Sequence, residues 1–258
     1  MIRSFIIVLF SIFLIQGCGS GSSAAVTNST TDKGKKTSVL LPLYVYPTKW
    51  NKSDELSVLI SATDGLFIAI INPSNGPDTS QNKDYVDGIE YLYLQNVKVI
   101  AYVYTSYTKR DKQDIYDDID AYVNFYGIKK LSGIFFDEVS LQNIPEESYM
   151  KDISEYAKAK GLDFIVLNPG TSVNQKIIDE NYYDIIVTYE NPYEKYVKFT
   201  NSLTSGSKTK QSLLVYNYPN LSSYQNEIQK AKDMNFDYLY FTIDTDPNPW
   251  DTVFNFLK

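Results

Sequence analysis

The sequence contains no histidine, and it has a single cysteine among its 258 residues. The lack of histidine excludes a Ser-His-Asp or Cys-His nucleophile system and any metal site that relies on imidazole ligands. The lone cysteine, Cys18, cannot form a disulfide within the chain. Whatever chemistry the protein performs must therefore use carboxylates, tyrosines, lysines or backbone groups.

Positive charge is also scarce. The chain has 24 lysines and arginines against 31 acidic residues, which gives a net charge of -7. A nucleic-acid partner is therefore not expected. The chain is rich instead in apolar residues, at 43%, and it has 23 tyrosines, whose flat faces and hydroxyls suit sugar rings. Its length allows one large domain of α/β-barrel size or two small ones.

The first residues have the features of a targeting segment. A positive region around Arg3 precedes an apolar run over 5–15 that is too short to span a membrane comfortably. Cys18 follows in a setting that resembles a bacterial lipobox, which implies lipidation of its thiol; the alternative is an ordinary secretory signal with an incidental cysteine. We expect a lipoprotein signal peptide over 1–17 and a flexible, lipid-anchored linker over 18–37, rich in Ser, Gly, Thr and Lys. The protein would then be held on the extracytoplasmic side of a bacterial cell envelope.

The folded domain is expected over 38–258, where short apolar runs alternate with segments of helical spacing. The sequence predicts eight strands, over 39–46, 65–71, 97–104, 134–137, 164–167, 185–189, 212–216 and 238–243. Helices are predicted over 84–95, 111–126, 145–160 and 224–234, with a last short helix over 250–257 and at most a short turn over 56–61. Parallel strands need crossover connections, so this alternation favours a single-domain (β/α)8 TIM barrel. A doubly wound open sheet is the runner-up, but no Gly-rich phosphate loop follows any strand.

Polar side chains gather where the predicted strands end, and the carboxyl ends of barrel strands are where active sites lie. Acids are disfavoured inside strands, yet Gly133-Ile134-Phe135-Phe136 runs directly into Asp137 and Glu138. The other strand ends carry Tyr44, Tyr46, Asn72, Tyr102, Tyr104, Asn168, Tyr189, Glu190, Tyr216, Asn217, Asp244 and Asp246.

A ring of acids, asparagines and tyrosines without histidine matches what glycoside cleavage needs. One carboxyl protonates the leaving oxygen, and another attacks the sugar or activates water. Asp137 and Glu138 would point to opposite faces unless the strand has ended between them. A Mg²⁺ or Ca²⁺ site from Asp137, Glu138, Glu190 and Asp244 is the competing interpretation, but no close-spaced ligand loop is present. Trp250 either covers a sugar site or anchors the last helix; we favour the second.

Six motifs occur in an order that resembles the spherulation-specific family 4 (spherulin-4-like) proteins, glycoside hydrolase family 135 and its relatives. The motifs are Leu41-Pro42-Leu43-Tyr44-Val45-Tyr46-Pro47, Asn72-Pro73-Ser74-Asn75-Gly76-Pro77, Ala101-Tyr102-Val103-Tyr104-Thr105, Gly133 to Glu138, Leu167-Asn168-Pro169-Gly170 and Tyr189-Glu190. The resemblance covers about residues 39 to 258. It implies a (β/α)8 barrel that acts as an endo-α-1,4-N-acetylgalactosaminidase on a galactosamine-containing exopolysaccharide.

The resemblance also implies roles for individual residues. Asp137 is expected as the nucleophile and Glu190 as the acid/base, with Glu138 supporting them. Separately from the resemblance, the positions of polar residues at the strand ends assign sugar binding to Tyr44, Tyr46, Asn72, Tyr102, Tyr104, Asn168, Tyr189, Tyr216 and Asp244. We expect a monomer that needs no metal or cofactor, with the polysaccharide as its substrate and the membrane reached through Cys18. A non-catalytic, lipid-anchored polysaccharide-binding or surface-coat module on the same barrel is the alternative.

Overall fold

The computed structural model describes residues 36–206, 209–219 and 224–257. The proposed signal peptide, the lipidation site Cys18 and all of the linker except Lys36 and Thr37 lie outside these residues. Among the described residues, no helix is long and apolar enough to cross a membrane.

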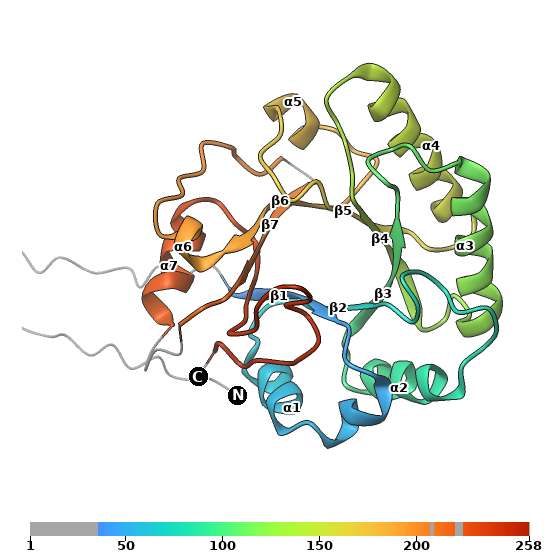
Figure 1. Cartoon of the computed structure of the whole chain (residues 1–258), viewed down its shortest axis with the longest axis horizontal. Coiled ribbons are helices and arrows are strands. Elements are labelled where there is room, and N and C mark those ends of the chain that lie inside the picture. The colour runs from blue at the N-terminus through green and yellow to red at the C-terminus, as the bar shows by residue number, and fades with distance from the viewer. Residues whose placement is uncertain (1–35, 207–208, 220–223, 258) are drawn as a thin grey trace, which may run out of the picture. The chain divides into compact units, whose positions relative to one another are not determined.

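The described part of the chain forms a closed barrel of eight parallel strands in sequence order, surrounded by helices (Figure 1). The predicted (β/α)8 barrel is therefore confirmed. The strands are β1 (Ser38–Leu43), β2 (Phe67–Ile71), β3 (Lys98–Tyr104), β4 (Leu131–Asp137), β5 (Phe164–Leu167), β6 (Ile185–Pro192), β7 (Lys210–Tyr216) and β8 (Tyr238–Phe241). The barrel closes where Ser38 of β1 pairs with Tyr238 of β8.

The helical segments are the 3-10 helix η1 (Pro47–Lys52) and the α-helices α1 (Asp54–Ala62), α2 (Lys83–Leu94), α3 (Lys112–Tyr126), α4 (Ile144–Ala159), α5 (Gln175–Ile178), α6 (Tyr193–Tyr196) and α7 (Gln225–Asp233). The four helices predicted between strands are present within one or two residues at each end. The predicted turn over 56–61 is instead the nine-residue helix α1. Its start is fixed by the Ser53 side chain, which accepts a hydrogen bond from the Leu56 N–H.

The prediction of a last helix over 250–257 is wrong. This segment runs without helical hydrogen bonds across one end of the barrel, beside β1 (Figure 1). Side chains satisfy its backbone N–H groups instead: Tyr240 accepts from Phe254, and Glu55 accepts from Asn255. Burial of Phe254 and Phe256 against the barrel outweighs the few internal bonds that so short a helix would make.

The core lies on both faces of the sheet, as expected for parallel strands covered by helices. Every residue of β2 is buried, for example. The close approach of β4 and β5 depends on Gly133, because a Cβ atom there would lie 1.6 Å from the Phe164 carbonyl oxygen. This glycine sets the position of the strand that ends in Asp137.

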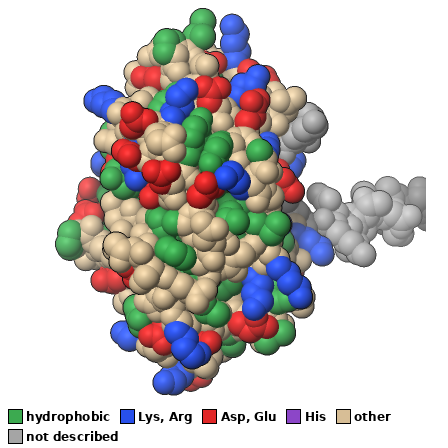
Figure 2. All heavy atoms as spheres, turned by 90° about the vertical axis from the view of Figure 1, so that its right-hand side faces the viewer, with side chains coloured by type: hydrophobic (Ala, Val, Ile, Leu, Met, Phe, Trp, Pro, Cys, Tyr) green, Lys and Arg blue, Asp and Glu red, His purple; other side chains and the backbone are tan. Residues whose placement is uncertain are grey.

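The outer surface shows acidic and basic side chains interleaved on the face that Figure 2 presents, which is the right-hand side of Figure 1. Ion pairs link α3 to α4 there, between Lys112 and Asp152 and between Lys160 and Asp120. Exposed pairs of this kind contribute little to stability.

Candidate active site

Asn168 holds two carboxylates together at the carboxyl ends of three neighbouring barrel strands. Its Nδ2 donates to Asp137 Oδ1 at 2.7 Å and to Glu190 Oε2 at 2.7 Å. Asp137 ends β4, Asn168 follows β5, and Glu190 lies in β6, so three neighbouring strands supply the three groups. Because both oxygens lie 2.7 Å from one nitrogen, they are at most about 5.4 Å apart.

The loop after β5 is tied directly to β6. Gly170 has a φ of +64°, a conformation in which glycine escapes the steric cost of a side chain. Its N–H donates to the Val187 carbonyl, and its own carbonyl accepts from the Glu190 N–H at 3.1 Å. Asn168 is thereby held beside Glu190, and only 6% of Asn168 is exposed.

Each remaining carboxylate oxygen of the pair also has a donor. The Tyr102 hydroxyl donates to Asp137 Oδ2 at 2.9 Å, and the Trp250 ring N–H donates to Glu190 Oε1 at 3.2 Å. Both carboxylates are therefore fixed at both oxygens, an arrangement that holds charged groups in one orientation.

Burial acts on the pKa of both carboxyl groups of the pair. Burial, followed by the charge of Asp137, raises the pKa of Glu190 to about 7. Burial also raises the pKa of Asp137, but hydrogen bonds from the Glu138 backbone, Tyr102 and Asn168 oppose that rise. With a pKa of about 7, the carboxyl of Glu190 can give or take a proton near neutral pH.

Glu138 lies just beyond the end of β4, so the alternation of strand faces does not apply to it. Its φ of +51° is left-handed, which is costly for a residue with a side chain. The loop after β3 holds this conformation, because the Tyr107 N–H and the Thr105 hydroxyl both donate to the Glu138 carbonyl. Burial and the nearby Asp137 raise the pKa of Glu138, and a bond from the Ser106 backbone opposes this.

Two of the other predicted sugar-binding tyrosines lie beside the pair. The Tyr44 ring meets Tyr102 edge to face, with centroids 5.8 Å apart, and burial and then the charge of Asp137 raise the pKa of Tyr44. The Tyr216 ring meets Trp250 in the same manner at 6.1 Å. Tyr44 and Tyr216 thus flank the carboxylates from β1 and β7.

Tyr46 and Asn72 are placed outside this cluster. The Tyr46 hydroxyl donates to Asp84 of α2 at 2.7 Å. Asn72 accepts from the Gly76 N–H through its side chain and so shapes its own loop. Both side chains make structural bonds, and within the described residues neither is hydrogen-bonded to Asp137.

Three further predicted residues are engaged in packing or loop contacts. The Arg110 guanidinium covers the Tyr104 ring at 4.3 Å. The Tyr189 ring packs on Phe199 outside the strands, with centroids 4.2 Å apart. Asp244 accepts from the Thr252 hydroxyl at 3.0 Å. Within the described residues, no three acidic or cysteine side chains group so that they could hold a metal ion.

Trp250 is the site residue that sequence reasoning misplaced, because an anchoring role in a helix was favoured for it. The ring is 6% exposed and bonds to Glu190, while the Trp250 carbonyl accepts from the Tyr44 N–H at 3.3 Å. No local signal could have revealed this contact, since 60 residues separate the partners.

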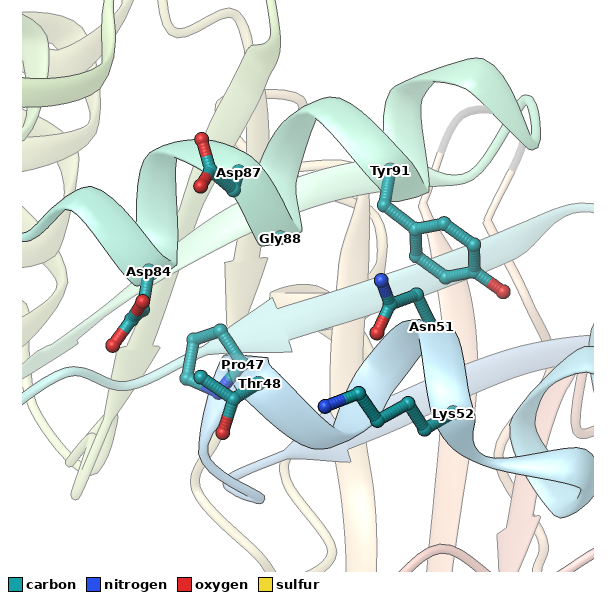
Figure 3. Close-up of a pocket in the computed structure, with 8 residues that line it drawn as sticks. All are labelled: Pro47, Thr48, Asn51, Lys52, Asp84, Asp87, Gly88 and Tyr91. Atoms are coloured by element: carbon teal, nitrogen blue, oxygen red, sulfur yellow. The ribbon is translucent and has the colours of Figure 1, made fainter.

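A cavity of about 190 Å³ between η1 and α2 is separate from the carboxylate pair (Figure 3). Its two acids are already engaged, because Asp84 accepts from Tyr46 and Asp87 pairs with Lys83. This cavity contains none of the residues predicted from the sequence to bind sugar.

Comparison with known proteins gives two further findings. Spherulin-4 from Physarum polycephalum is 36% identical over 194 residues, which are 71% of this chain and 56% of that protein. The chain thus spans little more than half of that relative. The crystal structure of Aspergillus clavatus Sph3 in complex with GalNAc superposes with a TM-score of 0.74 at 24% identity, covering 86% of this chain and 94% of that chain. This likeness concerns the fold.

The family relationship itself rests on most of the domain. The family model described as Spherulation-specific family 4 matches residues 38–258, which contain the barrel and both carboxylates. The chain therefore belongs to spherulation-specific family 4.

Proposed function

We propose that the protein is an endo-acting glycoside hydrolase that cleaves an α-1,4-linked exopolysaccharide of N-acetylgalactosamine and galactosamine. The observation that carries this proposal is the carboxylate pair bridged by Asn168, in which burial and the charge of Asp137 raise the pKa of Glu190 to about 7. Glycoside cleavage needs one acid and one nucleophile or base at such a site. Family membership and the GalNAc bound to the Sph3 structure support the same substrate class.

In the first step, Asp137 attacks the anomeric carbon while Glu190 gives its proton to the leaving oxygen. Tyr102 and Asn168 hold the attacking carboxylate, and Trp250 orients the acid. In the second step the ionised Glu190 takes a proton from water, and this water releases the sugar from Asp137.

The separation of the carboxylates supports retention of the anomeric configuration. Retaining enzymes hold their carboxyl groups about 5–5.5 Å apart, whereas inverting enzymes hold them about 6.5–9.5 Å apart to admit a water. The upper bound of about 5.4 Å between the two bridged oxygens favours the first class.

The test is product analysis with galactosaminogalactan. We expect the protein to release oligosaccharides, seen by mass spectrometry, and Asp137→Asn and Glu190→Gln proteins to release none while remaining folded by circular dichroism. Exposed Glu155 on α4 offers a matched control, and Glu155→Gln should keep full activity. Full activity in either carboxylate variant would remove the assignment.

The same experiment addresses the alternative of a binding module. Such a protein retains oligosaccharide in a pull-down but creates no new reducing ends. A panel of polysaccharides, compared by reducing-end release, then distinguishes linkage and acetylation preferences.

We also propose that the barrel is tethered to the bacterial cell envelope through a lipid on Cys18. The motif around Cys18 supports this, and detergent phase partitioning tests it. The protein should partition with the detergent, and a Cys18→Ser protein should move to the aqueous phase. Aqueous partitioning of both proteins would contradict the anchor.

A further inference from the structure

Another cavity, of about 450 Å³, lies at the end of the barrel opposite the carboxylate pair. Its walls are residues at the start of β2, β3 and β4, together with the last turn of α2. Because the barrel strands are parallel, these amino ends all lie away from the carboxyl ends that carry the pair. Lys130 directly precedes β4 and Asp137 ends it, so the strand separates their backbones by about 20 Å.

Exposed apolar side chains gather at this cavity. Leu66, Tyr93 and Leu94 all line it, and all three are exposed, Leu94 to 65%. Ile128, which is also exposed, directly precedes Lys129 of the lining. Single exposed apolar residues are ordinary, but a group of them marks a surface that contacts a protein partner or a membrane.

The charges in the lining of this cavity are all positive. Lys98, Lys129 and Lys130 contribute to it, and no acidic residue does. Glu90 of α2 pairs with Lys130, and the Lys98 ammonium lies over the Phe164 ring at 4.6 Å. Lys129 is exposed and makes no ion pair within the described residues. Apolar side chains beside lysines, in a protein with a net charge of -7, are typical of a surface that lies on anionic lipid.

The linker joins the barrel at the same place. The Gly65 N–H donates to the Thr37 carbonyl at 3.0 Å. The Leu66 N–H donates to the Ser38 hydroxyl, also at 3.0 Å. Leu66, an apolar side chain of the cavity, is therefore bonded to the residue at which β1 begins.

The sequence ahead of this junction fits the same partner. Lys33, Lys35 and Lys36 place three positive charges within four positions. Cys18 precedes Lys36 by 18 residues, so a lipid on its thiol would lie within about 60 Å of the barrel. A tether of that length gives the barrel a high effective concentration at the membrane, so even a weak contact surface would orient it.

We propose that this end of the barrel is a docking surface for an anionic lipid bilayer. The inference rests on the lipid anchor proposed above, and it adds the orientation of the anchored barrel. The apolar side chains lie at the level of the lipid headgroups, and the lysines lie against the headgroup phosphates. The carboxylate pair then faces away from the membrane, where a polymer outside the envelope reaches it. The docking surface consists of Leu66, Tyr93, Leu94, Lys98, Ile128 and Lys129.

The test places a polarity-sensitive fluorophore on Leu94→Cys in the lipidated, full-length protein. Lipidation occupies the thiol of Cys18, the only natural cysteine, so the introduced cysteine takes the label. The protein is reconstituted in phosphatidylcholine vesicles with and without phosphatidylglycerol. We expect the emission to shift to the blue in the anionic vesicles. The shift should be lost at 1 M salt, where the Debye length falls to about 3 Å.

Ile144→Cys provides the matched control position. Ile144 is 79% exposed, but it begins α4, close after the carboxyl end of β4. The same label there should report water in both kinds of vesicle. Equal shifts at the two positions, or no shift at Leu94, would overturn the docking surface.

A charge variant separates the docking surface from the dye's own affinity for lipid. An anionic surface strengthens binding about fivefold for each nearby lysine, so Lys129→Glu in the labelled Leu94→Cys protein should lower the ratio of docked to undocked protein at least about fivefold. Lys151→Glu changes an exposed lysine of α4 and should leave the shift unchanged. An unchanged shift in Lys129→Glu would contradict the proposal, because the dye is the same in both proteins.

Detergent partitioning of the same proteins separates this inference from the anchor. A protein that partitions with detergent but shows no shift at Leu94 keeps the anchor and loses the docking surface. A protein that partitions into water keeps the docking surface and loses the anchor if it still floats with anionic vesicles and Lys129→Glu abolishes this flotation. None of these measurements involves hydrolysis, so their outcome does not depend on the proposed substrate.

Discussion

Replacing Glu190 by glutamine should raise the stability of the variant relative to the unaltered protein as pH increases. The carboxyl of Glu190 has its pKa raised from an ordinary value of 4.5 to about 7 by burial and by Asp137. Ionising it in the folded state therefore costs about 3 kcal/mol. Glutamine has nearly the same shape and never carries this charge.

The pH window follows from the direction of that change. Between pH 4.5 and about 7 the folded protein keeps a proton on Glu190 that the unfolded chain has lost. Stability of the unaltered protein therefore falls as pH rises through this window and levels off above it. Glu190→Gln lacks this dependence, so the stability difference between the two proteins should grow by up to about 3 kcal/mol between pH 4.5 and pH 8.

The amide itself introduces a cost that does not vary with pH. Its N–H₂ group faces a donor, either the Asn168 amide or the Trp250 ring N–H, and a clash of donors costs about 1–3 kcal/mol. The quantity to measure is therefore how the difference in stability between Glu190→Gln and the unaltered protein changes with pH, and not the size of that difference at one pH.

Thermal and urea unfolding of both proteins at pH 4.5, 6, 7 and 8 provides the assay. In a domain of this size, 1 kcal/mol shifts Tm by about 2–4 °C, so the difference in Tm should change by about 6–12 °C across the series. Glu155→Gln on the exposed face of α4 should show no such trend. A difference that stays constant from pH 4.5 to pH 8 would refute the reasoning.

Three further predictions concern the same site and its support. Asp137→Asn should lower kcat on galactosaminogalactan roughly a thousandfold or more, whereas Glu138→Gln should lower it far less, since only Asp137 is expected to form a bond with the sugar. Equal losses of kcat in reducing-end assays would contradict these different roles. Trp250→Phe removes a hydrogen bond that favours ionised Glu190, so the basic limb of the pH–rate profile should move to higher pH. Gly133→Ala should cost more than about 3 kcal/mol in urea unfolding, because its Cβ atom would overlap the neighbouring strand; a smaller loss would mean that β4 shifts freely.

Much of the barrel could be predicted because its strands are uninterrupted apolar runs closed by loop residues. The order of the strands also predicts which site residues are neighbours. The strand that precedes Asn168 lies between those of Asp137 and Glu190, so sequential parallel order alone places the amide between the two acids. Its hydrogen bonds to both depend on side-chain geometry, which the sequence does not encode locally.

The orientations of the other predicted site side chains could not be predicted from the strand ends, because the direction of a side chain depends on how the backbone continues after the strand. Tyr44 and Tyr46 both lie beyond β1, yet Tyr46 turns to α2 whereas Tyr44 packs on Tyr102 beside the carboxylates. Helix α1 was underestimated because its capping serine, rather than apolar spacing, defines its start. Trp250 was misjudged because tertiary packing, and not helix propensity, decides the path of residues 250–257.

Because of the path of this C-terminal segment, the carboxylate pair is completed only by the last residues of the chain to be synthesised. The segment bonds to Glu55 in the first helix, across 200 residues of sequence, and supplies the indole that orients Glu190. A nascent chain can form β4 and β6 well before residue 250 leaves the ribosome, yet its acid then lacks one of its two donors. Cleavage just before residue 248 would have the same effect on the mature barrel. Such cleavage would remove the indole N–H that donates to Glu190 together with the buried Phe254 and Phe256, so it would disturb the acid and the packing of the barrel at once.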